Sequence, residues 1–201
     1  MKKKYYVAGM LVLAVALSFY IDNFAVDVFS KMQNIFLNEV FLGITFISSE
    51  IIIFFLLTSL FLWKEHKRRW ILPLWLTLLS SVAVGFILKI LVKRPRPFQL
   101  GLLPIDKILE SGSYLVWNFS FPSFQTMLVF CALPLLSKEF PKIKWFWIVF
   151  AVLVGISRLY FGLHFLSDVV IGGIIGYFIG MLIVKLEEGY KFGEKIWKRV
   201  F

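Results

Sequence analysis

The sequence predicts an all-α integral membrane protein, and its composition and the length of its apolar segments are the observations that predict it. Of its 201 residues, 60% are hydrophobic and only 17% are charged, and the mean hydropathy is +0.84. A soluble domain has about 45–50% apolar and about 25% charged residues. A transmembrane helix needs roughly 17 to 25 predominantly apolar residues, and the chain contains six such stretches or close approaches to them. Residues 1–201 are therefore expected to form a single membrane-embedded domain.

The six spans are expected, in chain order, at residues 5–21, 44–63, 70–92, 122–136, 145–163 and 165–186. Between the first two, apolar residues recur at helical spacing from Ala25 to Phe36. Such a pattern predicts a short amphipathic helix that lies in the membrane interface. Pro95 and Pro97 end the third span, because a proline disfavours helix in the residue before it. Pro122 marks the first turn of the fourth span, since proline is favoured at the first helical position.

Lysine and arginine residues are concentrated on one side of this six-span arrangement. They lie in the N-terminal segment, in the loops at residues 64–69 and 138–144, and in the tail from residue 185 onward. Cytoplasmic loops carry the excess of lysine and arginine, so both termini are predicted to be cytoplasmic. The net charge of +10 is then chiefly a signal of topology. It points to anionic lipid headgroups as the partners of this basic face, and not to nucleic acid.

Three segments at the opposite, extracytoplasmic ends of the spans carry groups suited to binding phosphate. Lys89 lies in the last turn of the third span, and Arg96 follows in an extended segment just beyond it. Ser123 lies at the start of the fourth span, where the free N–H groups of a helix N-terminus bind anions. Arg158, near the end of the fifth span, is a planar fork-shaped donor that matches a phosphate.

The third of these segments also contains a candidate nucleophile. His164 and Asp168 are four residues apart and therefore share one face of a helix. A carboxylate in that position can fix the tautomer of the imidazole and leave its other nitrogen free to attack. The single cysteine, Cys131, excludes an intramolecular disulfide and a thiolate metal site. The sequence thus predicts neither a metal nor another cofactor.

The first and third segments resemble motifs of the type 2 phosphatidic acid phosphatase superfamily, which includes membrane lipid phosphate phosphatases. The family pattern is KxxxxxxRP, then PSGH, then SRxxxxxHxxxD. The first and third motifs are complete here in Lys89, Arg96 and Pro97 and in Ser157, Arg158, His164 and Asp168. The resemblance extends over a motif-bearing core at residues 70–186.

The resemblance implies a role for each matching residue. The phosphoryl oxygens would be bound by Lys89, Arg96, Ser123, Phe124 through its backbone N–H, and Arg158. His164 would be the nucleophile that forms a phosphohistidine, and Asp168 would orient it. The resemblance also implies a metal-free reaction.

The second motif departs from the family pattern, because the chain reads Pro122-Ser123-Phe124-Gln125. Phe124 replaces the glycine, and Gln125 replaces the histidine that would protonate the leaving group. A glutamine cannot supply a proton, although it could donate a neutral hydrogen bond to the leaving oxygen. The other histidine, His66, is predicted on the opposite side of the membrane and cannot substitute.

The missing proton donor affects substrates unequally. A general acid contributes about 10²–10⁴ in rate and matters most when the departing oxygen is a strong base. A lipid monophosphate expels an alkoxide, which resembles hydroxide and is a strong base. A lipid diphosphate expels a phosphate, whose second pKa is about 6. The altered motif therefore favours a diphosphate substrate.

The sequence predicts a metal-independent phosphatase of the cell membrane that hydrolyses a polyprenyl diphosphate to the monophosphate on the outer face. One alternative is a lipid phosphotransferase, in which the phosphohistidine passes its group to an acceptor other than water. The other is a non-catalytic membrane protein that binds lipid phosphates. The altered second motif supports this alternative.

Overall fold

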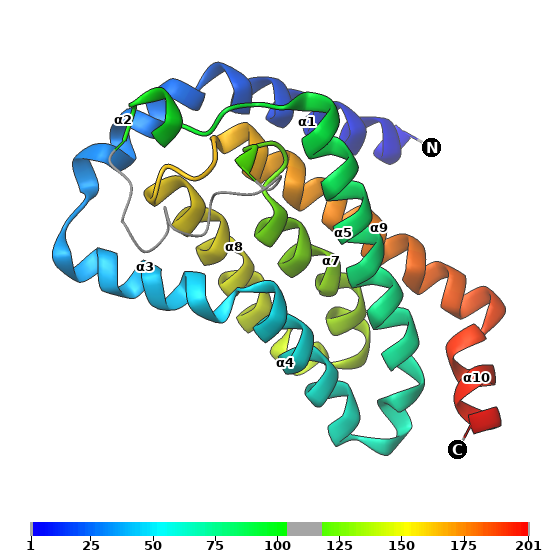
Figure 1. Cartoon of the computed structure of the whole chain (residues 1–201). Helices are drawn as coiled ribbons and strands as arrows, with labels where there is room; N and C mark the ends of the chain where they lie inside the picture. Colours follow the sequence, from blue (N-terminus) through cyan, green and yellow to red (C-terminus); the bar gives the residue numbers. More distant parts are fainter. Residues whose placement is uncertain (1, 104–117, 201) are drawn as a thin grey trace.

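The computed structural model describes residues 2–103 and 118–200, and this part of the chain is a bundle of helices without a strand (Figure 1). The α-helices are α1 (Lys2–Tyr20), α2 (Asp22–Met32), α3 (Ile35–Ile47), α4 (Glu50–Trp63), α5 (Ile71–Val92), α7 (Phe124–Glu139), α8 (Lys144–Tyr160), α9 (Leu166–Tyr190) and α10 (Phe192–Val200). Short 3₁₀ helices are η1 (Glu65–Trp70), η2 (Phe98–Leu100) and η4 (Pro141–Ile143). The predicted all-α membrane class agrees with this architecture.

Three helical segments of the described chain are long and apolar enough to cross a membrane, at residues 65–92, 141–160 and 166–190. Two further candidates are the pairs α1–α2 and α3–α4, each bent by 61°. The described residues therefore give three spans, or up to five, where six were expected. The missing one is α7, whose 16 residues extend only about 24 Å, less than the roughly 30 Å of the hydrocarbon core. The count of six spans and the cytoplasmic termini stay predictions.

The segment between the first and third spans differs from the expectation. The expected interfacial helix corresponds to α2, but it ends at Met32 and not at Phe36. The reason is Asn34, whose side-chain oxygen accepts a hydrogen bond from the Leu37 backbone N–H at 2.9 Å and so starts a new helix. The predicted span at residues 44–63 is in fact two helices, α3 and α4, separated by Ser48 and Ser49.

The start of α7 also differs from the expectation. The helix begins at Phe124, with Ser123 as its N-cap, and not at Pro122. Ser123 has an extended backbone, and its N–H donates to the Asp168 carbonyl at 3.1 Å. This bond holds the residue outside the helix and joins the start of α7 to the start of α9.

Helix α7 lies at the centre of the bundle, in contact with α5, α8 and α9 (Figure 1). Its closest neighbour is α9, because a Cβ atom at Gly176 would lie 2.3 Å from the Met127 carbonyl oxygen, and one at Gly180 would lie 2.0 Å from that of Cys131. The two backbones therefore touch, as small residues allow in membrane helix pairs. This contact fixes the two helices whose N-terminal ends carry predicted site residues.

The opposite end of the bundle carries a helix that the sequence analysis did not predict. Glu187 accepts hydrogen bonds from the backbone N–H groups of Gly193 at 2.8 Å and Glu194 at 3.2 Å, which caps the start of α10. A Cβ atom at Gly193 would lie 2.4 Å from the Arg69 carbonyl oxygen, so α10 packs directly on η1. We call the part formed by η1 and α10 the far end.

Candidate active site

The predicted residues come together at one end of the bundle, which we call the site end. It is formed by residues 89–97, 118–126 and 157–168. The buried side chains among the predicted residues are Lys89, Ser123, Phe124, Arg158, His164 and Asp168. Arg96 and Gln125 are half-buried. Burial of so many charged groups in an apolar bundle is costly, so their presence marks a candidate functional site.

His164 lies in the loop between α8 and α9, with 5% of its surface exposed. Because α9 begins at Leu166, His164 does not share a helix face with Asp168, and that expectation was wrong. Its Nδ1 is 2.6 Å from the Ser120 carbonyl oxygen. Since a carbonyl can only accept, Nδ1 carries the proton and Nε2 carries the lone pair. A nucleophilic imidazole needs this tautomer.

Asp168 lies near His164 but not in the expected arrangement. Its Oδ2 is 3.9 Å from Nδ1, beyond hydrogen-bond distance. Oδ2 accepts instead from the Phe165 backbone N–H at 2.8 Å, and Oδ1 accepts from Arg94 at 2.8 Å. The Ser120 carbonyl is thus the group that fixes the tautomer in this geometry. The carboxylate acts on the imidazole through its charge.

The surroundings of His164 favour the neutral imidazole. Burial lowers the pKa of His164 well below its usual range, and the nearby cations Arg96, Lys89 and Arg158 lower it further. The hydrogen bond to the Ser120 carbonyl opposes this shift. The lone pair of His164 is therefore available at neutral pH.

Three consecutive backbone carbonyls organise the site. Those of Asn118, Phe119 and Ser120 accept hydrogen bonds from Arg96, Lys89 and His164, respectively. The role of these carbonyls could not be predicted, because a backbone carbonyl leaves no signal in the residue type. Arg96 also donates to the Leu163 carbonyl at 3.1 Å. Burial lowers its pKa to about 10, so it remains charged at neutral pH.

Arg158 is held by three side-chain oxygens. It donates to the side-chain oxygen of Gln125, to the Thr45 hydroxyl from α3, and to Ser157 Oγ at 2.9 and 3.1 Å. Gln125 therefore orients the guanidinium of Arg158. Thr45 was not predicted, since nothing in the apolar sequence of α3 marks one threonine as facing the site.

The side chains of the two other residues of the second segment, Ser123 and Phe124, lie inside the bundle. The Phe124 ring points to α5, where a Cβ atom at Gly85 would lie 2.9 Å from Phe124 Cδ2. A glycine in α5 thus makes room for the bulky residue, and the ring does not point to lipid. Ser123 Oγ is 2.8 Å from Thr126 Oγ1, and both side chains are fully buried. In the described part of the chain, no cluster of three or more histidine, cysteine or acidic residues is placed to hold a metal.

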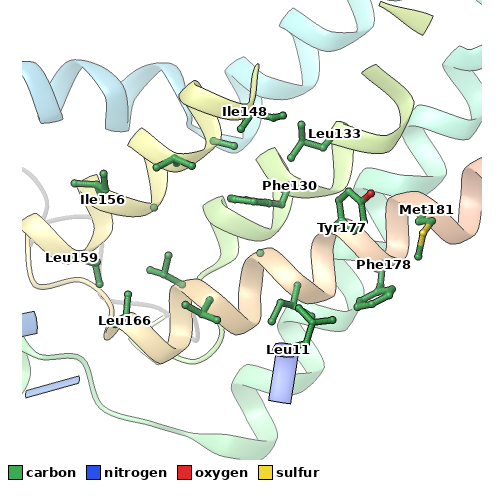
Figure 2. A pocket seen from close by; sticks show the side chains of 17 residues that line it. Leu11, Phe130, Leu133, Ile148, Ile156, Leu159, Leu166, Tyr177, Phe178 and Met181 are labelled. Carbon is green, nitrogen blue, oxygen red and sulfur yellow. The ribbon is translucent and has the colours of Figure 1, made fainter. Parts of the chain in front are cut away.

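A separate groove of about 800 Å³ lies between α8 and α9, with α7 at its floor (Figure 2). Its lining is apolar and includes Phe130, Ile156, Val170 and Phe178. None of the predicted site residues lines it. The apolar lining of the groove suits contact with lipid chains. The cations of the site end suit binding of an anion.

These features define a class: a multi-pass helical membrane protein with a buried histidine and several cations at one end of the bundle. The chain belongs to the PAP2 superfamily, whose family model matches residues 70–190. The matched region contains all eight predicted site residues.

Individual relatives support this assignment. The chain is 27% identical to an undecaprenyl-diphosphatase of Sulfolobus acidocaldarius, over 92% of this chain and 93% of the relative. It is 40% identical to phosphatidylglycerophosphatase B of Bacillus subtilis, over 39% of this chain and 41% of the relative.

Two solved structures resemble the fold. The crystal structure of a transmembrane PAP2-type phosphatidylglycerolphosphate phosphatase from Bacillus subtilis has a TM-score of 0.72 and 25% identity, and covers 96% of this chain and 99% of that one. The crystal structure of Aquifex aeolicus LpxE has a TM-score of 0.63 and 28% identity, and covers 80% of this chain and 92% of that one.

Proposed function

We propose that this chain is a metal-independent lipid phosphatase that acts through a phosphohistidine on a polyprenyl diphosphate. The observation that carries the proposal is His164, a neutral buried imidazole with a defined lone pair, surrounded by Lys89, Arg96 and Arg158. A buried nucleophile among three cations suits a substrate that brings negative charge on several oxygens.

In the proposed reaction, His164 Nε2 attacks the terminal phosphorus of the diphosphate. The Nε2–P bond forms, and the bond from phosphorus to the bridging oxygen breaks. The bridging oxygen leaves with the bond's electron pair on the lipid monophosphate. Lys89, Arg96 and Arg158 stabilise the charge on the transferring phosphoryl oxygens. Water then attacks the phosphorus of the phosphohistidine. The new O–P bond forms, the Nε2–P bond breaks with its electron pair returning to Nε2, and inorganic phosphate leaves while a proton of the water passes to solvent.

The preference for a diphosphate rests on Gln125. Its side-chain oxygen accepts from Arg158, and an amide is no proton donor. The leaving lipid phosphate, with its second pKa at about 6, needs no proton, whereas an alkoxide does. The similarity to an undecaprenyl-diphosphatase along most of the chain supports the same substrate class.

The decisive experiment offers the purified protein a polyprenyl diphosphate and a diacylglycerol phosphate side by side and measures released phosphate. We expect faster release from the diphosphate. Vanadate should inhibit, because it mimics the trigonal-bipyramidal phosphoryl group, and EDTA should not. Activity that EDTA abolishes and a divalent ion restores would contradict the metal-free reaction.

The same assay separates the two alternatives. Transfer of the phosphoryl group to a lipid acceptor, with little free phosphate, would identify a phosphotransferase. Turnover of neither substrate across pH and detergents would favour a protein that only binds lipid phosphates, as the missing general acid suggests.

We propose further that the site faces the extracytoplasmic side of the cell membrane, because the lysine-rich segments lie toward the far end. Cysteine scanning tests this placement, since the native Cys131 is fully buried. Gln99→Cys at the site end should react with an impermeant thiol reagent in intact cells, and Glu65→Cys at the far end should not. The reverse result would place the site in the cytoplasm.

A further inference from the structure

A network of buried charges adjoins Asp168 on the side away from His164. Arg94 donates from Nη1 to Asp168 Oδ1 at 2.8 Å and to Ser167 Oγ at 2.7 Å. From Nη2 it donates to Asp22 Oδ2 at 2.8 Å. Asp22 also accepts from the Ser167 backbone N–H at 2.8 Å and from the Ser167 hydroxyl at 2.6 Å.

Both carboxylates of the network are buried, and Arg94 is partly buried. The side-chain exposure is 6% for Asp22, 22% for Arg94 and 0% for Asp168. The Arg94 guanidinium also lies 4.0 Å from the centre of the Phe165 ring. Charges in such a setting interact strongly, because little water screens them.

The three charged groups come from parts of the chain that are distant in sequence. Asp22 is the first residue of α2, Arg94 follows α5, and Asp168 lies in the first turn of α9. The 61° bend between α1 and α2 brings α2 over the site end in Figure 1. The charges alternate along the network, so each neighbour stabilises the ionised form of the next.

Hydrogen bonds of this network fix the position of the Asp168 carboxylate. Its two oxygens are held by different groups, Oδ1 by Arg94 and Oδ2 by the Phe165 N–H. The orientation of the carboxylate is thereby fixed, with Oδ2 3.9 Å from His164 Nδ1. When Nε2 attacks phosphorus, the imidazole gains positive charge, which a carboxylate at this distance stabilises.

We propose that Asp22 and Arg94 are positioning residues: Asp22 holds Arg94, and Arg94 holds the Asp168 carboxylate where it supports His164 during phosphoryl transfer. Nothing in the three sequence motifs of the site assigns a role to either residue. The role in turnover rests on the proposed phosphatase function, whereas the control of His164 is a property of the folded protein.

The first test is kinetic. Arg94→Gln and Asp22→Asn should each lower kcat by about 10-fold to 100-fold, as loss of outer hydrogen-bond partners typically does. KM should stay nearly constant, because neither residue is among the proposed phosphate ligands. Arg94→Lys keeps the charge and should restore part of kcat. The double variant should be no worse than Arg94→Gln alone, since Asp22 acts through Arg94.

Matched controls separate this effect from general charge changes and from misfolding. Lys93→Gln removes an exposed cation next to Arg94, and Asp27→Asn removes an exposed carboxylate from the same helix as Asp22. Both should retain the wild-type kcat. Thermal unfolding of every variant shows whether it folds. If Arg94→Gln does not fold, Arg94→Lys takes its place as the test variant.

The second test does not depend on turnover. The chain has two histidines, so in a His66→Gln background an isotope-labelled imidazole reports on His164 alone by NMR. The cations that lower its pKa are Arg96 from the segment after α5, Lys89 from α5 and Arg158 from α8. Asp168 from α9 lies 3.9 Å from Nδ1 and is paired with Arg94. Arg94→Gln removes the cation that pairs with Asp168, so the carboxylate charge acts on His164 uncompensated and the pKa of His164 should rise. Asp22→Asn removes a negative charge, so the pKa of His164 should fall or stay below the pH range of the titration.

The outcomes are distinguishable. An unchanged pKa of His164 in Arg94→Gln, together with unchanged kcat, would overturn the positioning proposal and leave the phosphatase proposal standing. A raised KM at constant kcat would overturn it as well, since it would place Arg94 in substrate binding. If the wild type turns over no lipid phosphate, the phosphatase proposal fails, and the NMR titration still decides whether Arg94 controls His164.

Discussion

The two ends of the helical bundle use the same residue types under different degrees of burial. At the far end, Arg69 lies 3.5 Å from Glu194, and Glu194 lies 2.7 Å from Lys198, with side-chain exposures of 45%, 23% and 72%. At the site end, the Arg94 network is at most 22% exposed. Exposed ion pairs contribute about 0–1 kcal/mol, whereas loss of one partner from a buried pair costs about 3–5 kcal/mol.

The two histidines repeat the comparison. His66 is exposed in η1, next to the basic residues of the far end. His164 is buried, with its tautomer fixed by a backbone carbonyl. Both have cations nearby in the sequence or in space, so a basic neighbourhood by itself does not make a site. Burial and a fixed hydrogen-bond partner turn one of the two imidazoles into a candidate nucleophile.

The largest expected effect comes from removing that nucleophile. His164→Ala should lower lipid diphosphate hydrolysis to below about one hundredth of the wild-type rate, because loss of a nucleophile typically costs far more than that. His66→Ala is the matched control at the far end and should keep full activity. Comparable rates in the two variants would remove the distinction between the two ends.

The next effect concerns the proton donor. Gln125→His should raise hydrolysis of a lipid monophosphate by up to about 10²-fold, the lower end of what a general acid contributes. The gain is limited because Arg158 loses the Gln125 oxygen that it contacts. Assays with both substrates are needed, and the diphosphate rate should change little. An equal gain on both would mean that the histidine improves the pocket without donating a proton.

A smaller effect is expected in the pH dependence of stability. An unfolded histidine titrates near pH 6.5, and the pKa of His164 in the folded protein lies well below its usual range. As the pH falls through 6.5, the unfolded chain therefore binds a proton that the folded chain does not, and the free energy of unfolding falls.

Thermal unfolding in detergent between about pH 7.5 and about pH 5.5 measures this contribution. The loss of Tm should be smaller in His164→Gln than in the wild type. His66→Gln is the control that also removes one histidine, at an exposed position, so comparison with it isolates the effect of the buried site. If Tm falls with pH as much in His164→Gln as in the wild type, burial of His164 does not shift its titration.

The smallest effect is expected at the far end. The hydrogen bond from Lys198 lowers the pKa of Glu194, but the Lys198 side chain is 72% exposed, so water reaches this pair. Glu194→Gln should therefore leave both Tm and the hydrolysis rate unchanged within error. Asp22→Asn, the same chemical change in the buried network, should lower Tm clearly. A larger loss of Tm in Glu194→Gln would invert the comparison.

The sequence predicted the site end from short local patterns. The prolines after α5 do stop that helix before Arg96, but His164 lies in the loop before α9 and does not share a helix face with Asp168, although the four-residue spacing had suggested it. Each of these signals is local in the chain. A local pattern therefore sufficed to predict that these residues meet at one end of the bundle.

Other parts could not be predicted, for reasons that differ from place to place. The carbonyls of residues 118–120 have no residue-type signal. Asp22 and Thr45 reach the site only through the packing of helices far apart in sequence. The bend between α3 and α4 lies in a continuous apolar stretch, where Ser48 and Ser49 are compatible with an unbroken helix. Tertiary contacts decide all of these features.

The glycine contacts between α7 and α9 have a consequence for how such a protein can diversify. With no space for a Cβ atom at Gly176 or Gly180, the two helices cannot slide past each other. The spacing between Ser123 and the loop of His164 is therefore insensitive to changes elsewhere. Helices α3 and α4 lie outside the region that the family model matches, and α3 reaches the site through Thr45. Changes in these helices are therefore expected to reach Arg158 through Thr45 while the contact between α7 and α9 stays as it is.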